Sequence, residues 1–215
     1  MSNENKIKTL TLRLEELYTK ESKKLIFHGW HHVVFVKTKA LDFAVSIHAD
    51  VFLVESAALV HDLNYIIKAF SEPEEAKEYR HDLLSEIGYT ESEIERIESI
   101  IMESHTAIRN HTISNEWKAL SDADTLFKAL PITPILFTSN YIQQNQIDIQ
   151  KLASKITSEQ NKLLNEWIYF YTDLAKSKYL KRAEVNLALW NNVYESLKDK
   201  DITDMLDNAK KMWVL

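Results

Sequence analysis

The sequence of 215 residues contains no cysteine, only two glycines and only three prolines. Without cysteine it can form neither a disulfide bond nor a thiolate metal site, and the reducing cytoplasm is the expected location. Gly29 and Gly88 lie far apart, whereas loops that cradle phosphates need several glycines close together. A Walker or Rossmann loop is therefore excluded, and so few helix-breaking residues favour a mostly helical protein.

Positive charge is also in short supply, because 26 Lys and Arg residues face 32 Asp and Glu residues, for a net charge of -6. A general nucleic-acid or anionic-membrane binder needs an excess of Lys and Arg, so neither partner is expected. No apolar stretch approaches the length of a membrane span, and residues 1–8 lack the apolar core of a signal peptide. With 45% hydrophobic residues, the chain has the composition of a globular domain with a substantial core.

Apolar residues recur at helical spacing along the chain. Ile7, Leu10 and Leu14 predict an amphipathic first helix, and residues 94–101 repeat the pattern. Residues typical of helix N-termini occur at four places: Asp50, Ser71 with Glu74, Thr90 with Glu93, and Ser114. No alternating strand pattern of useful length and no internal repeat is found, so we expect an all-α fold.

Two His-Asp pairs occur in contrasting surroundings. His61 and Asp62 end the apolar run 57–60, where burying an imidazole beside a carboxylate is costly unless both are compensated. A bound metal ion is one explanation, and a helix that simply leaves the core is the other. His81 and Asp82 lie in a charged stretch, and we interpret them as an exposed helix face.

Further histidines and acids resemble a known pattern. In chain order, His32, His61-Asp62 and Asp124 match the His…His-Asp…Asp signature of HD-domain metal-dependent phosphohydrolases. The likeness is closer to the small stand-alone bacterial HD hydrolases. It is carried by these segments: His28-Gly29-Trp30-His31-His32, Ile87-Gly88-Tyr89, Ile101-Met102-Glu103-Ser104-His105-Thr106, Asp122-Ala123-Asp124-Thr125-Leu126, Tyr171-Thr172 and Arg182.

The resemblance implies an HD-type multi-helix bundle with C-terminal helices packed on it. We expect one helical domain over residues 1–215, with a core over about residues 20–140 and a C-terminal helical extension over about residues 141–215. A second copy of the chain is a candidate partner, which would make a homodimer.

The resemblance also assigns roles. Four residues are expected to bind a divalent metal ion: His32, His61, Asp62 and Asp124. Asp122 is the alternative to Asp124 as a ligand, and is otherwise a supporting or solvent-facing residue. Asp62, His28 and His105 are the expected catalytic residues, the two histidines by contacting phosphate or protonating the leaving oxygen. Two imidazoles and two carboxylates suit Mn, Fe, Co, Ni or Mg, with the identity and number of ions open.

The predicted activity is hydrolysis of a small phosphorylated substrate, a nucleotide first, by water that the metal ion activates. Two alternatives stay open: a non-catalytic HD module that binds a nucleotide or a metal, and a di-iron HD oxygenase. The first is motivated by Gly29 and Thr125, where the family has Asp and Arg, and by residues 63–65, where many members have Lys or an acid. The second is motivated by the extra histidines.

Two groups of residues near this site receive the simpler interpretation. Lys128 shares a helix face with Asp124 and could meet a phosphate, but we interpret it as a solvated surface lysine. The aromatic residues Trp167, Phe170 and Trp190 are assigned to the core.

Overall fold

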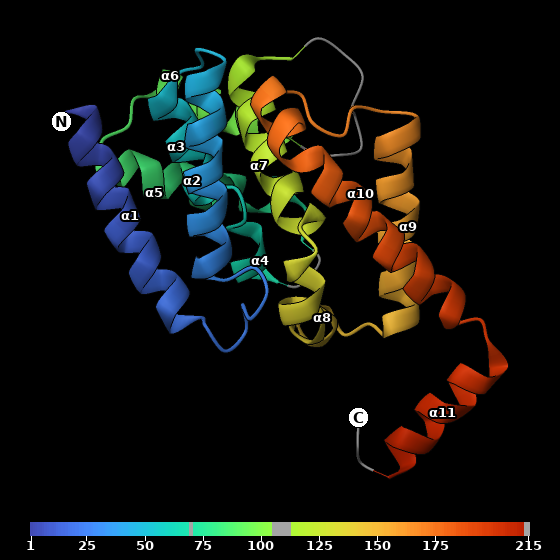
Figure 1. Cartoon of the computed structure of the whole chain (residues 1–215). Helices are drawn as coiled ribbons and strands as arrows, with labels where there is room; N and C mark the ends of the chain where they lie inside the picture. The colour runs from blue at the N-terminus through green and yellow to red at the C-terminus, as the bar shows by residue number, and fades with distance from the viewer. Residues whose placement is uncertain (69–70, 105–112, 213–215) are drawn as a thin grey trace.

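The computed structural model describes residues 1–68, 71–104 and 113–212, and every regular element in these ranges is helical, as expected for an all-α fold (Figure 1). In chain order the elements are α1 (Asn3–Lys20), α2 (Trp30–Ser46), α3 (Val51–Val60), α4 (Asn64–Ile67), the 3-10 helix η1 (Pro73–Ala76), α5 (Lys77–Ile87), α6 (Glu91–Glu103), α7 (Asn115–Ala129), α8 (Ile132–Asn145), α9 (Ile149–Asn165), α10 (Asp173–Ser196) and α11 (Lys200–Lys211).

Side-chain caps begin three helices where the sequence predicts them. A carboxylate oxygen of Asp50 accepts a hydrogen bond from the amide of Leu53 at 3.1 Å, at the start of α3. Thr90 and Glu93 form the predicted capping box at the start of α6. The hydroxyl of Ser114 caps α7. Each cap satisfies amide groups that the first helical turn leaves without partners.

The capping box predicted for Ser71 and Glu74 is wrong by one residue. Glu72 and Glu75 form that box at η1 instead. The hydroxyl of Ser71 is buried and donates to the carbonyl oxygen of Asn64, so it is not available to cap a helix. A tertiary contact therefore overrides the local motif.

The main core lies between α2, α3 and α7. Helix α3 has almost no polar face, and Ala57, Leu59 and Val60 near its end are fully buried. Helix α2 packs against both α3 and α7, with the small residue Ala40 fully buried. Small and branched side chains allow this close packing. As a result, the residues that follow α3 enter the middle of the molecule.

The C-terminal helices contribute to the same core and also build a smaller one. Phe170 and Ala183 belong to the main buried cluster. Leu152, Ala153 and Trp190 form a second cluster between α9 and α10. Helix α10 packs against both α9 and α7, so the second cluster is attached to the first.

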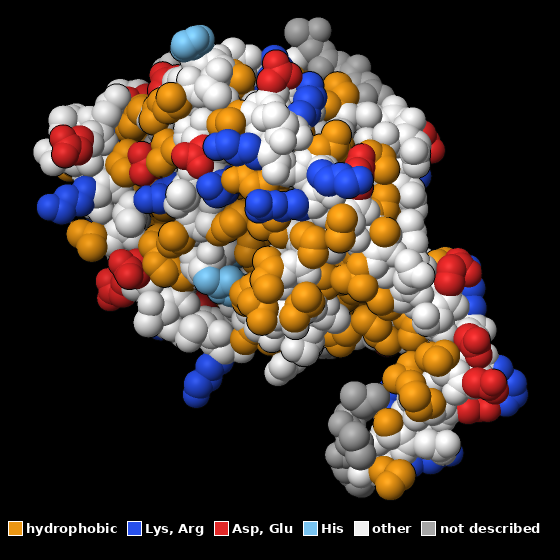
Figure 2. Space-filling model, in the orientation of Figure 1, with side chains coloured by type: hydrophobic (Ala, Val, Ile, Leu, Met, Phe, Trp, Pro, Cys, Tyr) orange, Lys and Arg blue, Asp and Glu red, His pale blue; other side chains and the backbone are white. Residues whose placement is uncertain are grey.

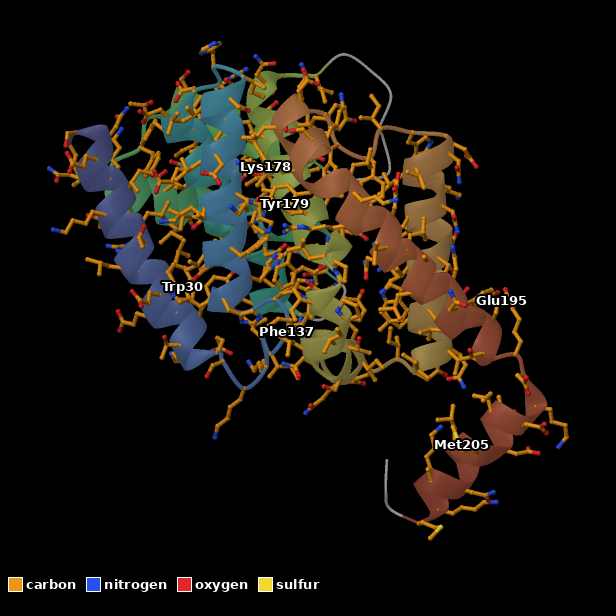
Figure 3. All side chains as sticks on the ribbon, viewed as in Figure 1. Trp30, Phe137, Lys178, Tyr179, Glu195 and Met205 are labelled. Atoms are coloured by element: carbon orange, nitrogen blue, oxygen red, sulfur yellow. The ribbon has the colours of Figure 1, made fainter. Side chains whose placement is uncertain are left out.

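The surface has two notable apolar regions. Helix α11 has no buried residue and extends away from the rest of the molecule, with Met205 55% exposed (Figures 1 and 3). Apolar side chains also gather over α8 and α10, and the exposed ones include Ile135, Leu136 and Val185 (Figure 2). None of the described helices combines the length and apolar character needed to cross a bilayer.

A buried ion pair joins α5 to α6. Arg80 is fully enclosed, and its guanidinium donates to both carboxylate oxygens of Glu98, at 2.6 and 2.7 Å. The guanidinium of Arg80 also donates to the carbonyl oxygen of Pro73 at 2.9 Å, and this bond holds η1 against α5. A paired buried charge of this kind becomes costly when either partner is removed.

We expect Arg80→Met to lower the free energy of unfolding by about 3–5 kcal/mol, because Glu98 would stay buried without its partner. The matched control is Arg13→Met, which removes an exposed ion pair with Glu86. This control should cost less than about 1 kcal/mol. Urea unfolding measures both variants, and losses of equal size would contradict the assigned role of the buried pair.

Candidate metal centre

Three helices bring the predicted ligands to one place. His32 is the third residue of α2, in its first turn, and its side chain is fully buried. His61 is the C-cap residue of α3, and Asp62 follows it. Asp124 lies on α7, which packs against both α2 and α3. The apolar packing of these helices thus determines where the four side chains meet.

The distances within this cluster suit one divalent ion. Nε2 of His32 lies 3.3 Å from Nε2 of His61 and 3.0 Å from Oδ2 of Asp62. Nε2 of His61 lies 3.4 Å from the same oxygen, and Oδ1 of Asp124 lies 3.5 Å from Nε2 of His32. Two ligand atoms bound about 2.1 Å from one ion, at tetrahedral or octahedral angles, are roughly 3.0–3.4 Å apart. The described residues contain one such group of three or more ligands, formed by His32, His61 and Asp62, and Asp124 adjoins it.

Hydrogen bonding around the cluster fits a bound cation. Nδ1 of His61 lies 2.8 Å from the carbonyl oxygen of Ala58, so an Nδ1–H group donates there and Nε2 is the ring nitrogen that faces the cluster. Oδ2 of Asp62 is buried and has no hydrogen-bond partner among the described residues, although Nε2 of His32 is 3.0 Å away. A buried carboxylate oxygen without a hydrogen bond is unfavourable, and a divalent cation would stabilise it.

Both carboxylates of the cluster are ionised at neutral pH. Burial alone would raise the pKa of Asp62, but the neighbouring His61 and His32 imidazoles outweigh burial and lower it. Burial likewise opposes the lowered pKa of Asp124, which is lowered chiefly by Lys128. Nζ of Lys128 lies 2.7 Å from Oδ2 of Asp124. Lys128 is half-exposed and forms an ion pair at the edge of the cluster, so it is more than the solvated surface lysine that we expected.

His28 lies beside the cluster and is held by other contacts. Its ring stacks almost parallel on Tyr65, with 3.8 Å between the ring centroids, and lies edge-on to His32. The side-chain amide of Gln144 donates to Nδ1 of His28 at 2.7 Å. Neither Tyr65 nor Gln144 is among the residues predicted for the site. Tyr65 is found only by its position one turn after His61, and Gln144 carries no sequence motif at all.

One residue that the sequence offered as a ligand, Asp122, is not part of the cluster. Asp122 is fully buried, and its carboxylate accepts hydrogen bonds from the amides of Tyr171 and Thr172, at 2.7 and 2.8 Å, and from the Thr172 hydroxyl. It anchors the start of α10 and is neither the alternative ligand nor solvent-facing. The reason is geometric, because residues two positions apart point to roughly opposite sides of a helix. The predicted role of His105 lies outside the described residues.

The second His-Asp pair lies on the surface, as the charged sequence around it indicated. The side chains of His81 and Asp82 are 43% and 68% exposed. Nε2 of His81 lies 3.2 Å from a carboxylate oxygen of Glu91. The same His-Asp pair thus lies in two opposite environments, and among the described residues the pair after α3 is the one that meets a further histidine.

The two departures from the family pattern have local consequences. A Cβ atom at Gly29 would collide with the carbonyl oxygen of Leu25, so this turn leaves no room for an aspartate. Thr125 is buried and lines a cavity beside Lys128. The positive charge on this wall therefore comes from Lys128, one helical turn further along.

A cavity of about 350 Å³ opens beside Asp124 and His28. Its walls come mainly from α7, α8, α9 and α10, and the segment before α2 and helix α4 also contribute. Besides Phe27, His28 and Asp124, its charged and aromatic lining residues are Tyr65, Lys128, Tyr141, Lys155, Glu159, Lys162, Trp167 and Trp190. The assignment of Trp167 and Trp190 to the core is therefore incomplete, because both side chains also face this cavity. Phe170 does belong to the core.

Comparison with known proteins identifies the fold. No protein-family model and no curated protein matches this chain. Bacillus subtilis YpgQ in complex with ADP matches with a TM-score of 0.66 and 21% identity, over 94% of this chain and 100% of that one. An HD-superfamily hydrolase from Bacillus thuringiensis matches with a TM-score of 0.63 and 20% identity, over 93% and 100%. The Lin1889 protein from Listeria innocua gives 0.60 and 19%, over 93% and 97%. The chain has the HD-domain fold, as predicted.

We expect the purified protein to contain a divalent metal ion that is lost in Asp62→Ala. This substitution removes the oxygen that lies within 3.4 Å of Nε2 of both His32 and His61. The matched control is Asp82→Ala, from the exposed His-Asp pair, and it should leave the metal content unchanged. Elemental analysis by mass spectrometry compares the variants. Full metal occupancy in Asp62→Ala would contradict the proposed centre.

A second prediction concerns pH. Burial lowers the pKa of His28 to about 3, from an ordinary value of 6.5. Between these values the unfolded chain binds a proton that the folded chain does not, so the free energy of unfolding rises with pH. We expect His28→Gln to reduce this slope between pH 4 and 6 and to leave it unchanged between pH 7 and 8, in urea unfolding. An unchanged slope at acidic pH would contradict a neutral, buried His28.

Proposed function

We propose that this protein is a metal-dependent phosphohydrolase, and that its substrate is a small phosphorylated molecule of the nucleotide class. One observation carries the proposal: Asp124 belongs both to the candidate metal cluster and to the wall of the lysine- and aromatic-lined cavity. A substrate that fills the cavity would therefore place a phosphate group beside the metal cluster.

The four candidate metal ligands form the part of the site where hydrolysis would take place. A divalent cation held by His32, His61, Asp62 and Asp124 would polarise a phosphate oxygen and lower the pKa of a bound water molecule. Asp62 and Asp124 stay ionised and offset the charge of the cation. Lys128 holds Asp124 by its second oxygen and adds positive charge at the edge of the cavity, where a phosphate would lie.

The cavity would bind the rest of the substrate. Its volume of about 350 Å³ is suitable for a small ligand. Lys155 and Lys162 offer ammonium groups that can pair with phosphates. Trp167 and Tyr141 offer aromatic faces on which a base can stack. The HD-fold neighbour YpgQ was solved in complex with ADP, which supports a nucleotide as the ligand class.

Catalytic roles are proposed for Asp62 as a ligand of the cation, and for His28 and His105 as groups that contact phosphate or protonate the leaving oxygen. The ring of His28 is buried, lines the cavity and lies beside the cluster. His105 keeps its role as a prediction from the sequence resemblance. The di-iron alternative needs a second set of ligands, and within the described residues one such group is found.

The test is an assay of phosphate and pyrophosphate release from nucleoside mono-, di- and triphosphates with Mn²⁺, Mg²⁺, Co²⁺ or Ni²⁺. We expect turnover that depends on the ion, and a loss of kcat of about 100-fold or more in Asp62→Asn. Lys162→Met should raise KM with little change in kcat. Asp82→Asn is the matched control and should behave like the wild type. Tight nucleotide binding without product, in metal-loaded protein, would contradict catalysis and favour the non-catalytic sensor.

A further inference from the structure

One side chain on α8 makes three contacts with the segment that carries His28. Oε1 of Gln144 accepts hydrogen bonds from the backbone amides of Phe27 and His28, at 2.8 and 3.2 Å. Nε2 of Gln144 lies 2.7 Å from Nδ1 of the His28 ring. The two residues are more than a hundred positions apart in the sequence, so this contact exists only in the folded protein.

The orientation of the Gln144 amide follows from its partners. Backbone N–H groups can only donate, so the atom that faces Phe27 and His28 main-chain nitrogens must be the oxygen. The other end of the amide is then the NH₂ group, which can only donate. The ring atom that it meets must accept, and in a histidine that atom is an unprotonated nitrogen.

This contact decides which proton the ring carries. An unprotonated Nδ1 means that His28 is neutral and that its proton is on Nε2. Stacking on Tyr65 fixes the plane of the ring, and His28 lines the cavity beside Asp124. We propose that Gln144 is a positioning residue that holds His28 as the neutral Nε2–H tautomer, so that His28 presents a hydrogen-bond donor to the cavity.

The use of this donor toward a phosphate oxygen of the substrate rests on the proposed function, whereas the tautomer itself does not. A neighbouring residue on α8 provides a matched comparison. Nδ2 of Asn140 donates to the carbonyl oxygen of Ile26 at 3.0 Å. Asn140 thus supports the same segment from the same helix without touching the His28 ring. A purely structural role for Gln144 predicts that both residues act alike.

The tautomer can be measured by long-range ¹⁵N–¹H NMR on histidine-labelled protein containing Mg²⁺, with the His28 signals assigned from His28→Gln. We expect the Nε2–H pattern in the wild type and in Asn140→Ala. In Gln144→Glu the side chain can accept but not donate, so the proton should move to Nδ1. An Nδ1–H pattern in the wild type, or an unchanged Nε2–H pattern in Gln144→Glu, would overturn the proposal.

Circular dichroism and thermal melting check that the variants fold. If Gln144→Glu does not fold, Gln144→Met takes its place, because methionine removes the donor without adding a charge. The expected result is then a mixture of both tautomers, and a pure Nε2–H pattern would overturn the proposal.

Enzyme kinetics provide a second, independent test of the role of Gln144. Gln144→Glu should lower kcat by about 10-fold or more with KM nearly unchanged, and should cause no further loss in a His28→Gln background. Asn140→Ala should keep its kcat. An additive loss in the double variant would overturn the positioning role. If the wild type turns over no substrate, the proposed function fails, while the NMR result still decides the tautomer.

Discussion

Two imidazoles and two carboxylates share a buried junction between α2, α3 and α7, and the cost of burying them constrains the surrounding structure. His32 and His61 face each other at 3.3 Å, and Asp62 completes the group with an oxygen that lacks a hydrogen bond within the described part of the chain. The helices that carry these residues are held by apolar packing, which determines where the four side chains meet. A metal centre needs such support from the surrounding structure to keep its geometry.

The C-terminal half of the chain supplies the cavity that lies beside the candidate metal ligands. Helices α8, α9 and α10 form most of the cavity beside Asp124 and provide much of its lysine and aromatic lining. Asp122 ties these helices to the core, because it accepts three hydrogen bonds from the segment before α10. Helix α7 therefore carries both Asp124, which lies beside the candidate metal ligands, and Asp122, which binds the segment before α10. In a chain with two glycines, the proposed phosphate site is therefore built from side chains and a candidate metal centre, not from a glycine-rich loop.

Much of the fold was predictable because its signals are local. Asp50, Thr90 and Ser114 begin helices through contacts within four residues, and such contacts depend on sequence alone. Ser71 shows the limit of such local prediction, because its hydroxyl donates to the carbonyl oxygen of Asn64, seven positions away, and does not cap a helix. The cluster of His32, His61 and Asp62 was predictable for another reason. The resemblance to a known signature carries information about three-dimensional proximity that spacing alone does not contain.

Sequence alone determined the helical fold class, the exclusion of glycine-rich phosphate loops and the residue types of the candidate metal centre. Only the tertiary structure separated Asp124 from Asp122, and the lining role of Trp167 from a place in the core. It alone brought Gln144 to His28. The physical reason is that these distinctions depend on which face of each helix is buried and which helix lies opposite. Those facts are decided by packing between segments far apart in the chain, and no local pattern records them.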